Sequence, residues 1–265
     1  NLIFAHQRPI SDFKFSPFEL SDDSGRNYSL LATTSADECV KLWKLPDRTS
    51  DNTYEKISEP EIVLSKTDKS YGVIHNLRFH PRIQNMLMTT QQGLVRFWDQ
   101  TANNVLVDVN LGDVAVTTAD FFTSQPYLFA ASCTDRTIRI YDTRTPQKQV
   151  TTYSNVHSSA KPTSVKCIEK AKKSKIFSVG FSKEGSREFA TFDLRMGEAS
   201  EPLQRVSIDH LSSVLAPFWD EDIGVMYLAG KGDANIRFYE LDTEADAFEY
   251  LAEYTPDTTE APQSK

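Results

Sequence analysis

The feature of this 265-residue sequence that most limits its fold is one pattern that occurs five times. Each copy begins with a turn and continues as alternating apolar and polar residues that end in an aromatic side chain. The five closing aromatics follow one another at intervals of 43 to 55 residues: Trp43, Trp98, Tyr141, Phe192 and Tyr239. Alternation with a period of two is typical of β-strands, and repeats slightly longer than 40 residues are typical of stacked sheets.

Each copy also contains three further strand-like runs. Around Tyr141 these are VTTADF, YLFAASC and QVTTYS. Four short strands per repeat predict one propeller blade per repeat. We therefore expect an all-β propeller over residues 1–251. Its five four-stranded blades are expected at about residues 1–68, 69–111, 112–154, 155–209 and 210–251, followed by a polar linker or the start of another blade at 252–265.

The run Gly-Lys-Gly-Asp at 230–233 raises the possibility of a phosphate-binding loop. Such a loop needs G-x-x-x-x-G-K-[ST] before a helix, but here Gly232 follows Lys231 and a strand-like run comes next. Three copies carry an aspartate six residues before the aromatic: Asp37 before Trp43, Asp135 before Tyr141 and Asp233 before Tyr239. The run is therefore predicted to be a repeated hairpin turn, because glycine accepts positive φ and aspartate accepts neighbouring N–H groups.

Signals for catalysis or cofactor binding are weak. Ser182 lies between Gly180 and Gly185 but misses the G-x-S-x-G pattern by one residue. The five histidines show no zinc-motif spacing, and Asp220, Glu221 and Asp222 share one predicted connecting turn. We expect no enzyme, no cofactor and no metal site.

Charge and hydropathy limit the partners. The net charge of −8 disfavours long-range attraction to nucleic acid or anionic lipid. No run approaches the roughly 18 apolar residues of a membrane span, and the first residues lack the features of a leader peptide. We expect a cytoplasmic protein without direct membrane insertion.

The segment IDHLSSVLAPFWDEDIGVMYLAGKGDANIRFYEL, residues 208–241, resembles a blade of the coronins, a family of WD-repeat proteins. AHQRPISDFKFSPF with LLATTSADECVKLWKLP, and FSVGFSKEGSREFATFDLR, are also similar to coronin blades in order and spacing, so the resemblance covers nearly the whole chain. It implies that the first blade here corresponds to the second of a seven-bladed ring. We accordingly expect sequence beyond both ends to supply the remaining blades.

WD repeats are held by a His-Ser-Asp-Trp hydrogen-bond set, which the resemblance predicts to be complete only in the first blade, as His6, Ser35, Asp37 and Trp43. In the second blade Gln92 replaces the aspartate and Ser70 stands near the histidine position, and the third has Gly112 and Cys133. We expect a structural role for ten repeat residues: His6, Ser35, Asp37, Trp43, Trp98, Asp135, Tyr141, Phe192, Asp233 and Tyr239.

The resemblance implies a non-enzymatic scaffold that binds actin filaments and regulates actin organisation, associated with the cytoskeleton. The alternative is an adaptor in Golgi or vesicle trafficking or in ubiquitin-ligase recruitment, as the tandem-propeller coronins suggest. Because the filament surface is acidic, the positive charge of an acidic partner must be gathered locally. Two groups are candidates, each with a plain solvated role as the alternative: Lys166, Lys170, Lys172, Lys173 and Lys175, and Arg136, Arg139 and Arg144 with Lys148.

Overall fold

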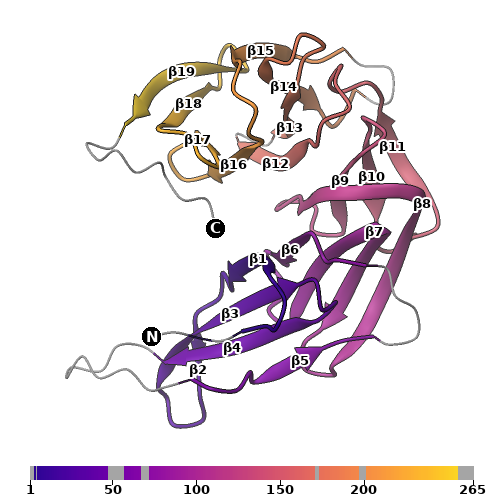
Figure 1. Cartoon of the computed structure of the whole chain (residues 1–265), viewed down its shortest axis with the longest axis vertical. Coiled ribbons are helices and arrows are strands. Elements are labelled where there is room, and N and C mark those ends of the chain that lie inside the picture. The colour runs from indigo at the N-terminus through magenta and orange to yellow at the C-terminus, as the bar shows by residue number, and fades with distance from the viewer. Residues whose placement is uncertain are drawn as a thin grey trace. The chain divides into compact units, whose positions relative to one another are not determined.

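A computed structural model describes residues 3, 5–46, 57–66, 72–170, 173–196 and 201–255 of the chain. Within these ranges the elements are the strands β1 to β19, in agreement with the expected all-β class (Figure 1). The chain divides into two compact units, Asn1–Val116 and Thr117–Lys265, and each is described by itself.

The first unit opens with an antiparallel sheet in the order β1-β3-β4-β5, and β2 pairs with β3. Its strands are β1 (Ile10–Phe15), β2 (Leu20–Ser21), β3 (Asn27–Ser35), β4 (Val40–Pro46) and β5 (Ile62–Leu64). β6 (Asn76–Phe79), β7 (Met86–Asp99) and the part of β8 (Asn104–Phe121) up to Val116 follow, with β7 paired to both β6 and β8.

The chain reverses direction inside β7, although β7 is one continuous element. Gln100 N donates to Asn85 O at 2.8 Å, and Trp98 Nε1 donates to Thr89 Oγ1 at 2.9 Å, so the two ends of β7 lie side by side. At the reversal Gly93 has φ +65°, and a Cβ there would lie 2.1 Å from the carbonyl oxygen of Gly112. Only glycine fits this tight form of the turn predicted between the two strand-like runs.

A shared apolar core joins the parts of the first unit. It contains Ala32, Val40, Leu42, Leu64, Ile74, Leu77, Phe79, Leu87 and Trp98. The fully buried carboxylate of Asp12 on β1 reinforces it by accepting from Asn76 Nδ2 at 3.1 Å and from Leu77 N at 3.0 Å. A buried carboxylate is tolerated when neighbouring donors satisfy it, so this contact fixes β1 beside β6.

The second unit contains three runs of antiparallel strands, each in chain order. The end of β8 is followed by β9 (Leu128–Cys133), β10 (Ile138–Asp142) and β11 (Gln149–Tyr153). The next sheet is β12 (Ser164–Lys170), β13 (Lys173–Phe181), β14 (Arg187–Asp193) and β15 (Gln204–Asp209). The last sheet is β16 (Leu215–Asp220), β17 (Val225–Gly230), β18 (Ile236–Asp242) and β19 (Ala247–Tyr254).

Two apolar clusters lie between these sheets. One joins β9–β11 to β12–β14 and includes Tyr153 and Phe192, whose rings lie 5.1 Å apart. The other joins β12–β14 to β16–β19 through Phe177, Phe189 and Tyr239. All five closing aromatics of the repeats are buried, so the period seen in the sequence is the period of residues that fill the core.

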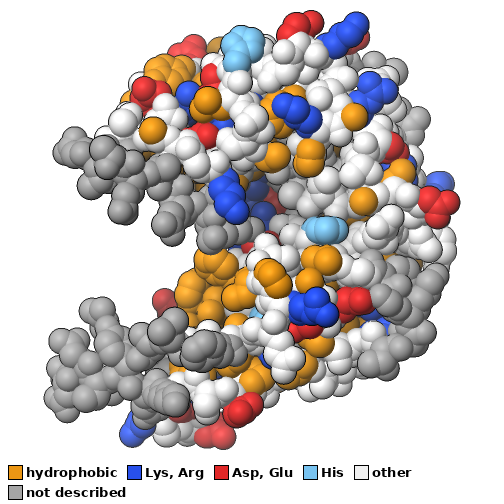
Figure 2. Space-filling view, in the orientation of Figure 1, with side chains coloured by type: hydrophobic (Ala, Val, Ile, Leu, Met, Phe, Trp, Pro, Cys, Tyr) orange, Lys and Arg blue, Asp and Glu red, His pale blue; other side chains and the backbone are white. Residues whose placement is uncertain are grey.

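Apolar side chains also remain exposed on the first and the last sheet of the chain. Figure 2 shows hydrophobic side chains gathered over β1 of the first unit, where Ile10, Phe13 and Phe15 are exposed. In the second unit Tyr250 and Tyr254 on β19 are exposed as well. The seven-bladed ring and the blade boundaries given above stay predictions.

Candidate protein-interaction site

In the first unit, a histidine network links the chain before β1 to the hairpin of β3 and β4. His6 contacts Asp37 Oδ2 through Nδ1 at 2.7 Å and Thr33 Oγ1 through Nε2 at 2.9 Å. Trp43 Nε1 donates to the same Thr33 oxygen at 2.9 Å. The hydroxyl in the set is therefore that of Thr33, and the assignment of Ser35 is corrected.

The register of the hairpin explains the difference. Thr33 pairs with Lys41, and Trp43 lies two residues beyond Lys41 on β4. Ser35 is two residues further along β3, about 7 Å away, beyond reach of the indole. Its hydroxyl instead accepts from Asp37 N at 3.2 Å, which closes the turn.

A second network of the same form lies in the second unit, and the sequence analysis missed it. His157 contacts Glu188 Oε1 at 2.7 Å and Ser178 Oγ at 3.0 Å. A Cβ at Gly180 would lie 2.5 Å from the imidazole, so glycine leaves the space that His157 fills. The signal was present: His157 precedes Glu188 by 31 residues, as His6 precedes Asp37. The closing aromatic here is Phe192, which has no N–H to donate.

The protonation of His157 gives a pH-dependent prediction. Burial lowers the pKa of His157, although Glu188 opposes the shift. In the unfolded chain the imidazole takes up a proton below about pH 6.5, whereas in the folded protein it takes up the proton only at a lower pH. The stability from this group is therefore present above about pH 6.5 and is lost as the pH falls.

We expect the urea concentration at the unfolding midpoint of the wild-type protein to decrease when the pH is lowered from 7.5 to 5.5. The decrease is expected to be smaller in His157→Gln. This window lies above the ordinary pKa of glutamate, about 4.3, so titration of Glu188 contributes little to it. Equal changes in the two proteins would show that His157 does not titrate differently on folding.

The Gly-Lys-Gly-Asp run connects two sheets of the second unit. Arg187 on β14 is fully buried, and its Nη1 donates to Asp233 Oδ2 at 2.7 Å. Its Nε donates to Asp209 Oδ1 at 2.6 Å. A Cβ at Gly230 would lie 2.3 Å from the Asp233 carboxylate and 2.7 Å from Arg187 Nη1. The glycine therefore makes room for an ion pair, and Asp233 anchors the β17–β18 turn to β14.

The lysine-rich hairpin end between β12 and β13 contacts its neighbours through most of its charges. Lys166 pairs with Asp120 at 2.8 Å, and Lys170 Nζ donates to the carbonyl oxygens of Glu221 and Asp222 at 2.5 and 3.0 Å. Lys172 lies outside the described residues. The lysines thus tie this hairpin to β8 and to the β16–β17 turn.

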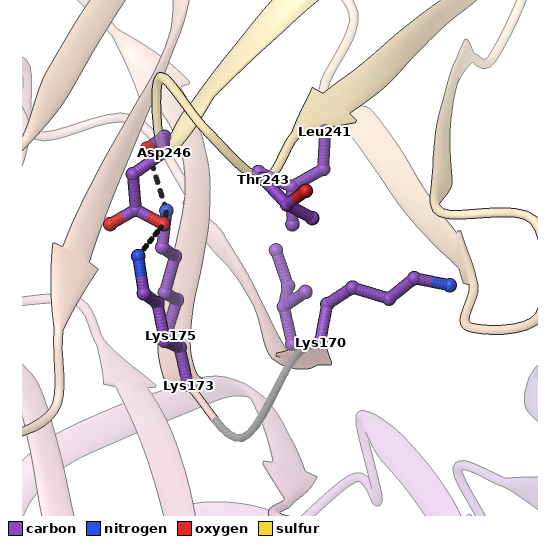
Figure 3. Close-up of a pocket in the computed structure, with 7 residues that line it drawn as sticks. Lys170, Lys173, Lys175, Leu241, Thr243 and Asp246 are labelled. Carbon is purple, nitrogen blue, oxygen red and sulfur yellow. Dashed lines mark hydrogen bonds and ion pairs between the residues drawn. The ribbon is translucent and has the colours of Figure 1, made fainter.

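Lys173 and Lys175 both point toward Asp246, with Nζ–Oδ1 distances of 3.1 and 2.9 Å (Figure 3). Lys170 points away from this pair and lines the same small pocket with Leu241, Thr243 and Ile168. The side chain of Lys175 is only 2% exposed. It therefore serves as a link to the β18–β19 turn and is unavailable to a partner, which removes it from the predicted patch.

The three predicted arginines lie at opposite ends of β10. Arg136 occupies the turn before the strand with φ +66°, and Arg139 pairs with Asp135 Oδ2 at 2.6 Å beside it. Arg144 follows the strand, eight residues after Arg136, and the five residues of β10 between them span about 17 Å. They do not form one patch.

Arg144 is repeated structurally by Arg195, which the sequence analysis did not single out. Arg144 binds the Asp142 carboxylate through Nε at 3.0 Å and Nη2 at 2.6 Å, and Arg195 binds Asp193 at 3.0 and 2.5 Å in the same way. Hydrogen bonds from these arginines hold the pKa of both carboxyls below the ordinary value. The signal was an Asp-x-Arg step after the closing aromatic, in YDTR and FDLR. We call Arg144 and Arg195 the arginine rim.

Comparisons with known proteins agree with this architecture. The family "WD domain, G-beta repeat" matches residues 110–142. The crystal structure of the WD40 domain from Toxoplasma gondii coronin superimposes with a TM-score of 0.81 and 26% identity, covering 96% of this chain and 61% of that one. The fold and its networks therefore define a WD40-repeat protein of the β-propeller class.

Sequence relatives narrow the class. Coronin-like protein crn1 of Schizosaccharomyces pombe is 30% identical over 257 residues, which cover 96% of this chain and 39% of the relative. Human Coronin-2A is 26% identical over 95% of this chain and 45% of its own length, and bovine Coronin-7 is 30% identical over 89% and 23%. The chain belongs to the coronin family, and it spans less than half the length of these curated relatives.

The residues that the structure describes form no helix long and apolar enough to cross a membrane. Nor do they contain a group of three or more histidine, cysteine, aspartate or glutamate side chains suited to hold a metal ion.

Proposed function

We propose that this chain is the actin-filament-binding part of a coronin-type protein that organises the actin cytoskeleton as a non-enzymatic scaffold. The observation that carries the proposal is the similarity to coronins over 96% of the chain, in both sequence and fold. The charge distribution supports it: the chain carries a net charge of −8, yet it presents exposed arginines at the end of β10 and after β14. An acidic filament requires such local positive charge.

Co-sedimentation with actin filaments tests the proposal. The full-length protein is expected to pellet with filaments and to pellet less as the salt concentration is raised from about 50 to about 200 mM, because salt screens exposed charges. Failure to pellet at every salt concentration would contradict the actin role. A protein that does not polymerise, added in place of actin, controls for self-sedimentation.

A second candidate function is an adaptor in Golgi or vesicle trafficking or in ubiquitin-ligase recruitment. It is favoured by the matches to Coronin-7 of cattle and human, whose identities of 30% and 29% are close to that of the yeast relative. The sequence of the full-length protein separates the two candidates, since a coiled-coil tail indicates the conventional type and a second propeller indicates the tandem type.

A further inference from the structure

The two arginines of the rim are held at one end of the same pair of sheets. Tyr127, which lies under the Arg144 guanidinium at 3.7 Å, and Leu194, which precedes Arg195, both pack against the core cluster between β9–β11 and β12–β14. Leu194 N donates to Ser174 O at 3.2 Å, at the start of β13. Arg195 therefore lies at the end of its sheet that carries the β12–β13 hairpin.

Glu169 connects that hairpin to the loop beneath Arg144. Its carboxylate accepts from the backbone N–H of Ser124 and from Ser124 Oγ, the latter at 2.6 Å, and from Ser174 Oγ at 3.3 Å. The chain from Ser124 leads directly to Tyr127, whose carbonyl accepts from Thr143 N at 2.9 Å. A continuous set of contacts thus joins the two arginine turns across the two sheets.

Each guanidinium is presented outward over a carboxylate that lies beneath it. Arg144 is 64% exposed and Asp142 13%, and Arg195 is 69% exposed and Asp193 8%. The Asp carboxylate engages Nε and Nη2, and the Tyr127 ring supports one face of Arg144. A partner therefore meets two arginines that are already oriented, which lowers the entropy lost on binding.

The surroundings of the rim fit a protein partner with acidic side chains. Exposed Met196 follows Arg195, and exposed Val150 and Lys148 lie just beyond Arg144 in the chain. Arginine is enriched at the centres of protein interfaces, where its remaining N–H groups bind carboxylates. The equivalent position after β18 is Glu244, so the sheet of β16–β19 does not carry a third such arginine.

We propose that Arg144 and Arg195 form one docking rim that binds carboxylate side chains on the actin filament. This inference rests on the proposed function, since actin is the partner it names. Lys170 and Lys175 of the β12–β13 hairpin serve to hold neighbouring turns in place, because their charges are engaged within the protein.

The test is co-sedimentation of the full-length double variant Arg144→Gln/Arg195→Gln with actin filaments. Loss of two oriented cations is expected to weaken binding by about tenfold or more. The matched control is Lys183→Gln/Lys231→Gln, which removes two exposed charges from the turns at the other end of the strands and is expected to bind as the wild type does. Arg144→Lys/Arg195→Lys, which keeps the charge without the forked geometry, is expected to recover only part of the binding.

The possible results separate the rim from the actin role. If the wild-type protein pellets and the rim variant binds with the same affinity, the rim is wrong and the actin role stands. If the control variant loses binding as much as the rim variant, total charge decides and the rim is again wrong. If the wild-type protein does not pellet, both proposals fail. An unchanged urea midpoint in the rim variant confirms that it is folded.

Discussion

Arg187→Ala is expected to lower the free energy of unfolding by about 3–5 kcal/mol, because removing one partner of a buried ion pair leaves an uncompensated charge. The guanidinium is fully buried and contacts Asp209 at 2.5 Å, Asp233 at 2.7 Å and Ser213 Oγ at 2.9 Å. Arg237 still pairs with Asp209 in the variant, but Asp233, only 3% exposed, loses its cation. Urea denaturation measures the effect.

Arg139→Ala is the matched control. This arginine, on β10, also pairs with an aspartate, at 2.6 Å, but the pair is partly open to solvent, with the Arg139 side chain 18% exposed and that of Asp135 31% exposed. Its loss is expected to cost about 1 kcal/mol or less. If Arg187→Ala does not fold, the milder Asp233→Asn serves in its place. Equal costs for the Arg187 and Arg139 variants would show that the buried pair is not a structural link.

Phe189→Ala is expected to lower the free energy of unfolding by about 3–5 kcal/mol, as large-to-small changes in a packed core do. Phe189 is fully buried, and its ring lies 4.9 Å from that of Phe177 and 5.1 Å from that of Tyr239. The variant loses the burial of the ring and leaves a cavity between β14 and the neighbouring sheet. Thermal and urea unfolding both report the loss.

Two comparisons isolate this effect. Phe189→Leu retains most of the volume and is expected to cost about 1.5 kcal/mol or less. Phe218→Ala removes an aromatic ring that is half exposed on β16 and is expected to have a small effect. A similar destabilisation by the Phe189 and Phe218 alanine variants would contradict the assignment of the core.

Repetition within the sequence predicted the strands and their buried side. Trp43, Trp98 and Tyr239 are buried residues that occupy the same position in their respective repeats. The repeat defines where each copy lies, and the alternation of apolar and polar residues within a copy indicates strands. The Gly-Lys-Gly-Asp turn was predicted for the same reason. Ser35 was assigned in place of Thr33 because the sequence pattern predicts the two strands but not their register. The register decides which of these two hydroxyl residues, two positions apart on β3, lies near Trp43.

Contacts between sheets could not be predicted. Lys175 binds Asp246, 71 residues away, and Arg187 binds Asp233, 46 residues away. Nothing local in the sequence says which turn of the next sheet a lysine will meet. The lysines at 166–175 therefore resembled a free basic patch, whereas Arg195, outside any cluster, remained unnoticed although it is exposed.

Hydrogen exchange in wild type and Arg187→Ala tests the central claim most directly, which is that side chains at the strand ends lock neighbouring sheets together. Mass spectrometry measures the exchange of the backbone amides in each segment. We predict faster exchange in the variant both in β14, which carries the substitution, and in the β17–β18 hairpin, which loses its anchor at Asp233. Faster exchange confined to residues 187–193, with residues 225–242 unchanged, would contradict the claim.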